Sequence, residues 1–125
     1  MTAGVAEILA QANATFETHD VAGAFELPQA LRIAVRGAKK FDGYITLGCV
    51  VRGETDHYDY ICSTSMQGLM DVALQFGLAT GTALLTVDTV AQALARSRET
   101  GANKGGEAAV AALKQIALAR QLGAA

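Results

Sequence analysis

The residues with the clearest capacity for chemistry stand together at positions 52–57, which read Arg-Gly-Glu-Thr-Asp-His. His57 can take up or release a proton near neutral pH. Gly53 permits a tight turn and a close approach of the backbone to a ligand. Thr55 and the backbone N–H groups at the start of the next helix could hold an anion. This stretch therefore predicts a site for proton transfer beside a bound anion.

The alternative interpretation of positions 52–57 is a solvated loop with a surface histidine, which composition alone favours. However, the stretch directly follows an apolar run at 44–51. In open α/β sheets the ligand crevice lies beyond the carboxyl ends of the strands, so this placement brings the two interpretations nearly level. Asp56 and Asp59 flank His57, and either could orient its ring.

A second candidate lies at 23–28, which reads Gly-Ala-Phe-Glu-Leu-Pro. The segment leads into a predicted helix whose first N–H groups could bind hydroxyls or an oxyanion. Phe25 could stack on a flat ring. The alternative is an ordinary helix start with a core phenylalanine, and these residues favour that alternative when they stand alone.

Arg96 and the segment 103–106, Asn-Lys-Gly-Gly, form a third candidate. Arginine is the usual bidentate partner of phosphate. Lys104 stands at the start of the last predicted helix, where anions are attracted. The alternative is a cation that stabilises a helix C-terminus. No phosphate-loop, G-x-S-x-G or G-x-G-x-x-G pattern supports a nucleotide site or a serine hydrolase.

Alternating helix-like and strand-like segments must position these residues. Apolar positions after Thr2 fall on one helical face that Thr2 could cap, and continuous apolar runs predict parallel strands buried on both faces. The alternation predicts one domain over 1–125, an α/β fold of the three-layer α/β/α sandwich type with a small parallel sheet. The predicted strands are 15–21, 44–51 and 79–87, and the loops that could carry chemistry are 22–27, 52–57 and 86–89.

Punctuating residues mark the helices between these strands. Pro28 suits the first turn of one helix. Gly77 would end a long helix that carries Leu69 and Phe76 on its apolar face. Asp88 would cap the following helix, and a glycine-bearing loop at 100–106 precedes the last one.

Composition limits the class of protein. The chain has 125 residues, 51 % of them apolar and 18 % charged, with a net charge of −2. These values exclude a disordered chain and give no electrostatic footprint for nucleic acid. The high apolar share suggests surface reserved for partner subunits. The uncharged stretch 72–87 is too short and too polar to span a membrane, and the first residues lack the basic flank of a signal peptide.

The cysteine content points to a reducing compartment. Cys49 and Cys62 are too few and too far apart for a disulfide scaffold or a zinc site. We therefore expect a cytoplasmic protein that holds no metal.

Four segments, in matching order and spacing, resemble the 6,7-dimethyl-8-ribityllumazine synthase family of riboflavin biosynthesis. They are GAFELP at 23–28, LGCVVRGETDHYDY at 47–60, LLTVDTVAQALAR at 84–96 and NKGGEAA at 103–109. The resemblance covers nearly the whole chain. It implies a flavodoxin-like fold and a transferase that condenses 5-amino-6-(ribitylamino)uracil with 3,4-dihydroxy-2-butanone 4-phosphate. An imine forms, phosphate leaves, and rearrangement and ring closure follow, without cofactor or metal.

The resemblance also implies roles for particular residues. His57 is similar to the family's proton-transfer histidine, and Arg96 to the arginine that grips the butanone phosphate. Gly53, Glu54 and Thr55 resemble the loop that meets that phosphate with backbone and hydroxyl groups.

Other positions resemble the parts of the family that bind the second substrate. The segment 24–26 resembles the part that binds the ribityl chain, and 49–51 resembles the strand end beside the pyrimidine ring. Lys104 resembles the lysine of the family's N-K-G segment. The substrate-binding residues so implied are Ala24, Phe25, Glu26, Cys49, Val50 and Val51.

The resemblance further implies a homo-oligomer. In the family the site lies between neighbouring subunits of a pentamer, and twelve pentamers can form a larger shell. Arg96 would then serve the partner's site. The substrates are small molecules, and riboflavin synthase is a candidate protein partner.

The chain departs from the family pattern in three ways. Members begin with a strand that ends in an aromatic loop, so the chain resembles a fragment that starts after that strand. The alternative function is therefore a non-catalytic, truncated assembly module. Thr82 stands where many members carry a phenylalanine that covers the substrate ring from the next subunit, and Thr100 stands where many carry a second lysine.

Overall fold

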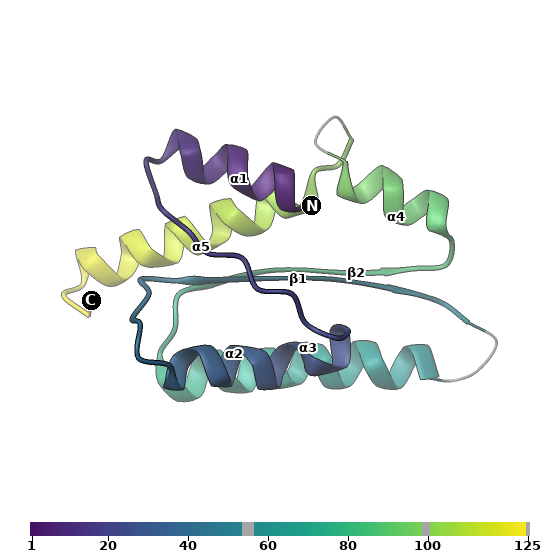
Figure 1. Cartoon of the computed structure of the whole chain (residues 1–125), viewed down its shortest axis with the longest axis horizontal. Helices are drawn as coiled ribbons and strands as arrows, with labels where there is room; N and C mark the ends of the chain where they lie inside the picture. Colours follow the sequence, from purple (N-terminus) through teal and green to yellow (C-terminus); the bar gives the residue numbers. More distant parts are fainter. Residues whose placement is uncertain (54–56, 99–100, 125) are drawn as a thin grey trace.

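Two parallel strands between two layers of helices form the frame of the molecule (Figure 1). The computed structural model describes residues 1–53, 57–98 and 101–124. β1 (Tyr44–Val51) pairs along its whole length with β2 (Thr80–Val87), so that Tyr44 lies opposite Thr80 and Val51 opposite Val87. The predicted three-layer α/β/α arrangement with a small parallel sheet is confirmed.

The helices divide between the two faces of the sheet. α1, α4 and α5 lie on one face, and α2 and α3 lie on the other (Figure 1). A short 3₁₀ turn, η1, precedes α2. The bounds are α1 Thr2–Gln11, η1 Ala24–Glu26, α2 Leu27–Arg36, α3 His57–Phe76, α4 Val90–Ser97 and α5 Lys104–Gln121.

Small residues let α5 lie directly against β2. A Cβ atom at Gly81 would clash with the backbone carbonyl of Ala108 in α5. Ala109 is fully buried and packs with Val5 and Leu9 of α1. This close approach anchors α5 on the sheet and α1 on α5.

The opposite face is packed by larger apolar side chains. Leu27 and Leu31 of α2 form a buried cluster with Leu69 of α3. Side chains at Gly48 would collide with Leu27 and with Leu84 of β2, so the absence of a side chain there lets α2 approach β1 closely. The apolar stripe predicted for α2 is therefore its buried face.

The punctuating residues act largely as predicted. Pro28 stands in the first turn of α2, where its missing N–H costs nothing. Gly77 ends α3 with a positive φ of 61°. Two capping predictions were wrong by one residue, however. Thr2 is the first helical residue of α1 and not its cap, and Thr89 caps α4, because its side chain accepts a hydrogen bond from the backbone N–H of Gln92.

The predicted strand at 15–21 is wrong. Residues 14–21 are irregular chain that passes from α1 on one face to α2 on the other, with Ala14 packed in the first cluster and Val21 in the second. A strand requires a ladder partner. Among the described residues β1 pairs with β2 alone, so the outer edge of β1 has no ladder partner.

Burial of both strands is also less complete than predicted. Cys49 and Val51 are exposed, and so are Thr82 and Thr86. In the described residues the sheet has two strands, so each is an edge strand. Side chains along both strands are therefore only partly covered.

The contact between α5 and β2 yields a stability prediction. Gly81→Ala should lower the free energy of unfolding by about 1–3 kcal/mol, because the new methyl group meets backbone that cannot move without shifting α5. Urea unfolding followed by circular dichroism measures the change. Gly53→Ala is the matched control, since a Cβ there meets nothing within 4 Å. Equal midpoints for both variants would contradict this account of the packing.

Candidate site at the strand ends

The carboxyl ends of the two strands are tied together by Arg52. Its backbone N–H donates to the Val87 carbonyl at 2.8 Å. Its Nε donates to Asp88 Oδ1 at 2.9 Å, and its Nη2 lies 3.7 Å from Asp59 Oδ1. Its guanidinium carbon lies 4.3 Å from the centre of the Tyr58 ring. The hydrogen bond to Asp88 is the main cause that raises the pKa of Arg52, which therefore stays charged.

His57 lies beside this cluster. It is the first residue of α3 and its side chain is exposed. β1 ends at the carboxyl edge of the sheet, and α3 begins with His57 near that edge. Asp59 forms an ion pair with Arg52, so one of the two carboxylates proposed to orient His57 has another partner.

The 3₁₀ turn η1 lies on the same side of the sheet as α3 and contacts both α3 and β1. A Cβ at Gly48 would lie 3.7 Å from the Ala24 Cβ. Side chains alternate along a strand, so Val50 shares this side, whereas Cys49 and Val51 point to the opposite face. Phe25 is 48 % exposed, so the alternative of a core phenylalanine is not the one realised.

Arg96 and Lys104 lie on the other face of the sheet. Arg96 is exposed in the last turn of α4, and Lys104 is the first residue of α5. Both helices cover the face opposite α3 (Figure 1). One chain therefore separates these two cations from His57 by the thickness of the sheet.

The segment 103–106 is built for a tight helix start. Asn103 adopts a left-handed conformation, with φ 49° and ψ 53°, and its side chain accepts a hydrogen bond from the Gly106 N–H at 3.2 Å. Gly105 packs against the backbone of Met1. Lys104 donates to Glu107 at 3.0 Å. This geometry gives the segment a structural role whatever it binds.

Thr82 also lies away from His57 within one chain. It is the third residue of β2, and its hydroxyl forms a 2.8 Å hydrogen bond with the Thr46 hydroxyl. The site at the strand ends is five residues further along, which is about 16 Å at the rise of a strand. Glu54, Thr55, Asp56 and Thr100 lie outside the described residues.

The two thiols are poor nucleophiles in this setting. Partial desolvation raises the pKa of Cys49 and of Cys62 above the ordinary thiol value. Both therefore carry their proton near neutral pH.

Gly53 has open space where a Cβ would stand and no positive φ. Its own backbone conformation therefore does not require glycine.

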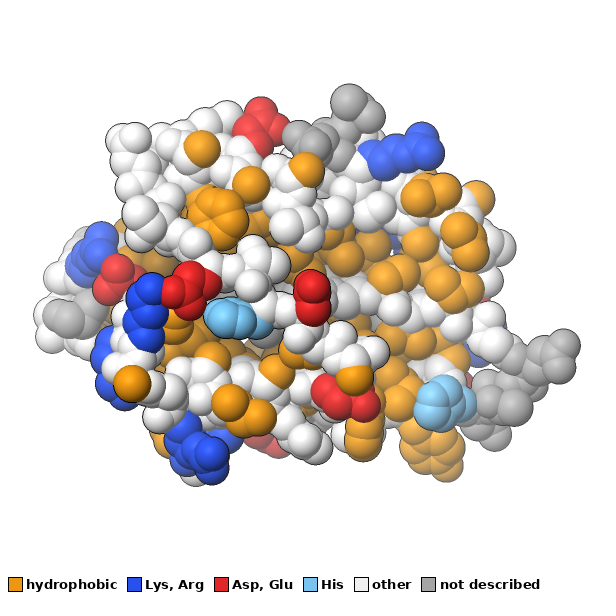
Figure 2. Space-filling model, viewed as in Figure 1, with side chains coloured by type: hydrophobic (Ala, Val, Ile, Leu, Met, Phe, Trp, Pro, Cys, Tyr) orange, Lys and Arg blue, Asp and Glu red, His pale blue; other side chains and the backbone are white. Residues whose placement is uncertain are grey.

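Large apolar side chains are exposed on the elements that meet at the strand ends. Figure 2 shows hydrophobic side chains over much of the face of the molecule on that side. Monomeric proteins seldom expose so many together. The residues concerned are Phe25, Val51, Tyr60, Val90 and Leu94.

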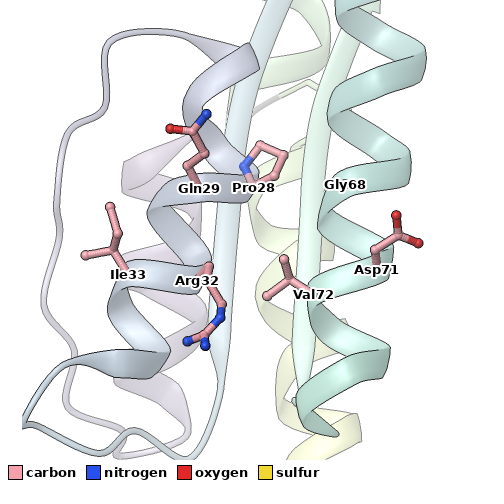
Figure 3. A pocket seen from close by; sticks show the side chains of 7 residues that line it. All are labelled: Pro28, Gln29, Arg32, Ile33, Gly68, Asp71 and Val72. Carbon is pink, nitrogen blue, oxygen red and sulfur yellow. The ribbon is translucent and has the colours of Figure 1, made fainter.

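A surface groove of about 510 Å³ lies elsewhere, between α2 and α3 (Figure 3). Its walls come from the two helices, with the Arg32 guanidinium 4.2 Å from the centre of the Phe76 ring nearby. Of the described candidate segments, only the last residue of 23–28, Pro28, lines it. The lining residues are Pro28, Gln29, Arg32, Ile33, Gly68, Asp71 and Val72.

Sequence reasoning missed the part played by Arg52. A signal was present, because Arg52 directly follows β1 and Asp88 directly follows β2, and the strands pair in register up to Val51 and Val87. Opposite charges at matching positions after two parallel strands predict a cross-strand pair.

Among residues 1–53, 57–98 and 101–124, no helix is long and apolar enough to cross a membrane. Over the same residues, no group of three or more metal-ligating side chains comes together.

Comparison with known proteins gives a consistent result. A family model described as 6,7-dimethyl-8-ribityllumazine synthase matches residues 1–120. The 6,7-dimethyl-8-ribityllumazine synthase of Paramagnetospirillum magneticum is 43 % identical over 129 residues, covering 93 % of this chain and 86 % of that protein. The 6,7-dimethyl-8-ribityllumazine synthase 1 of Rhizobium meliloti is 44 % identical over 128 residues, covering 99 % and 84 %. That of Bartonella tribocorum is 42 % identical over 120 residues, covering 96 % and 80 %.

The start of α5 provides a test of local structure. Asn103→Ala should lower the free energy of unfolding by about 0.5–2 kcal/mol, because the Gly106 N–H loses its acceptor. Asn103→Gly is the matched comparison, since glycine tolerates the left-handed conformation and costs only a few tenths as a cap. Thermal unfolding of both variants measures the difference. Both variants lack the acceptor, so the loss that they share measures the hydrogen bond, and any extra loss in Asn103→Ala measures the strain of the left-handed backbone. Full stability in both variants would contradict a stabilising role for this hydrogen bond.

Proposed function

The chain belongs to the 6,7-dimethyl-8-ribityllumazine synthase family, a family of transferases in riboflavin biosynthesis, and we propose that its reaction centre lies at the carboxyl ends of β1 and β2. There it would condense 5-amino-6-(ribitylamino)uracil with 3,4-dihydroxy-2-butanone 4-phosphate and release phosphate. The observation that carries this placement is the position of His57. It is exposed, it is the first residue of α3, and it follows β1 in the chain.

Each substrate has a matching part of the site. The start of η1, which contacts β1, suits the hydroxyls of the ribityl chain through its first backbone N–H groups, whereas the Glu26 N–H already donates to the Gly23 carbonyl. Phe25 and Val50 offer apolar surface for the flat pyrimidine ring. Arg96 suits the phosphate, because a guanidinium binds two phosphate oxygens at once. Lys104 at the start of α5 adds positive charge to the helix N-terminus.

His57 supplies proton transfer. Imine formation, loss of phosphate and ring closure each require a proton to be moved on or off nitrogen or oxygen. An imidazole in contact with solvent can perform these transfers in both directions near neutral pH. Gly53, Glu54 and Thr55 complete the proposed loop around the phosphate.

We propose further that the complete site forms between subunits of a homo-oligomer, with five subunits in a ring. His57 and Arg96 stand on elements that cover opposite faces of the sheet. A neighbouring copy can bring its own Arg96 to the His57 of the first, which is a head-to-tail contact that closes into a ring. The exposed apolar side chains at the strand ends support an interface there, and Thr82 would reach the site from the neighbour.

We also propose a cytoplasmic location. The free cysteines Cys49 and Cys62 support it, because reducing compartments keep such thiols unpaired.

The alternative function is a non-catalytic assembly module of the same family. Such a module would keep the fold and the ring and lack turnover, so activity alone distinguishes it from the enzyme.

The shared site can be tested by complementation. His57→Ala and Arg96→Ala should each reduce turnover, by about 10- to 10⁴-fold for the proton-transfer residue. When the two inactive proteins are unfolded together in equal amounts and reassembled, about a quarter of the sites receive both intact side chains. Lumazine absorbance should therefore recover to about a quarter of the activity of the unaltered chain.

The control for complementation is a protein that carries both substitutions in one chain, reassembled with itself. It should stay inactive, because no site then has both groups. Mixed rings confirmed by native mass spectrometry that show no recovery would contradict a site shared between subunits. An assembled, unaltered chain without turnover would support the assembly module instead.

A further inference from the structure

The Arg52 side chain joins three elements at the strand ends. Its Nε–Oδ1 hydrogen bond to Asp88 fixes the turn after β2, and its ion pair with Asp59 reaches the first turn of α3. Its guanidinium also lies over the ring of Tyr58. The Arg52 backbone is itself held to Val87, so the side chain works from a fixed base.

These contacts use properties that only arginine combines. A planar guanidinium can donate to two separate carboxylates and stack on an aromatic ring at the same time. A single exposed ion pair would contribute little, whereas several contacts made by one side chain form a network that restrains geometry. Here the network spans the turn after β2 and the helix that starts at His57.

The restrained helix turn is the one that carries the proposed proton-transfer residue. His57 is followed at once by Tyr58 and Asp59, and both contact Arg52. Arg52 therefore ties the first turn of α3 to the turn after β2. A reacting group displaced by about 1 Å can lose about 100-fold in rate, so such restraint matters for catalysis.

We propose that Arg52 is a positioning residue for the condensation, acting through Asp88, Asp59 and Tyr58 to hold His57 at the strand ends. This inference rests on the proposed function, because it assigns His57 to proton transfer. Arg52 itself need not touch either substrate.

Kinetics of folded, assembled variants test the proposal. Arg52→Ala should lower kcat by about 10- to 100-fold. The KM for the ribitylaminouracil should stay within about 2-fold, because the proposed contacts of that substrate on η1 and β1 do not involve the Arg52 side chain. Arg52→Lys should recover only a small part of kcat, since an ammonium cannot hold both carboxylates and stack on the ring.

Variants of the partner separate positioning from general loss of stability. Asp88→Asn keeps an oxygen that accepts the Arg52 hydrogen bond and should retain most of kcat. Asp88→Ala should lower kcat, and the double variant with Arg52→Ala should be no slower than Arg52→Ala alone, as expected for one coupled unit. Arg120→Ala is the matched control: it removes another exposed arginine, paired with Asp42 at 3.4 Å and remote from the strand ends, and should leave kcat unchanged.

Hydrogen exchange gives a second readout that does not depend on turnover. The backbone amides of residues 61–64 donate to carbonyls in the first turn of α3. Arg52→Ala should speed their exchange and leave the amides of α5 unchanged, whereas Arg120→Ala should change neither set.

The outcomes are distinct. Slower turnover together with faster exchange at 61–64 supports the proposal. Unchanged kcat, an effect confined to KM, or additive effects of Arg52→Ala and Asp88→Ala would overturn it. An unaltered chain that shows no turnover refutes the proposed function and with it the catalytic part of this inference, although exchange would still report whether Arg52 holds the helix turn.

Discussion

The contact between α5 and β2 is the constraint on which the rest of the structure depends. Gly81 leaves no room for a side chain against Ala108, so helix and strand meet at backbone distance. Ala109 and Ala112, both buried, continue the same flat surface along α5. α1 lies on α5, and Ile45 and Leu47 of β1 pack against the cluster that joins the two helices. The position of α5 on the sheet therefore fixes where its own first turn lies and where the whole of α1 lies.

The two-stranded sheet of the described residues affects where chemistry can occur. Arg52 follows β1 and Asp88 follows β2, and the hydrogen bond between their side chains spans the carboxyl ends of the two strands. The two other cations of the proposed site, Arg96 and Lys104, belong to helices of the opposite face. The proposed site residues therefore stand on both faces of the sheet, and a second copy of the chain would be needed to bring them together.

Elements defined by local signals could be predicted from the sequence, whereas features set by distant partners could not. The apolar run at 44–51, Pro28 and Gly77 each carry their meaning within a few residues, and the structure agrees with all three. Residues 15–21 resemble a strand locally, but strand formation depends on a neighbour to pair with. Asp88 and Thr89 are both good caps of α4. Thr89 takes the role because its side chain accepts from the Gln92 N–H, while the Asp88 carboxylate accepts from Arg52 across the strands.

The outer edge of β1 also bears on how the chain behaves in a cell. Within the described residues, the N–H and C=O groups along that edge have no ladder partner. Such an edge can pair with any extended segment that reaches it, which makes it a template for aggregation. Newly synthesised chains are vulnerable for as long as the edge stays uncovered. Covering of that edge therefore competes with misassembly for newly made chains. Chaperones that shield exposed strands would raise the yield of correctly folded protein.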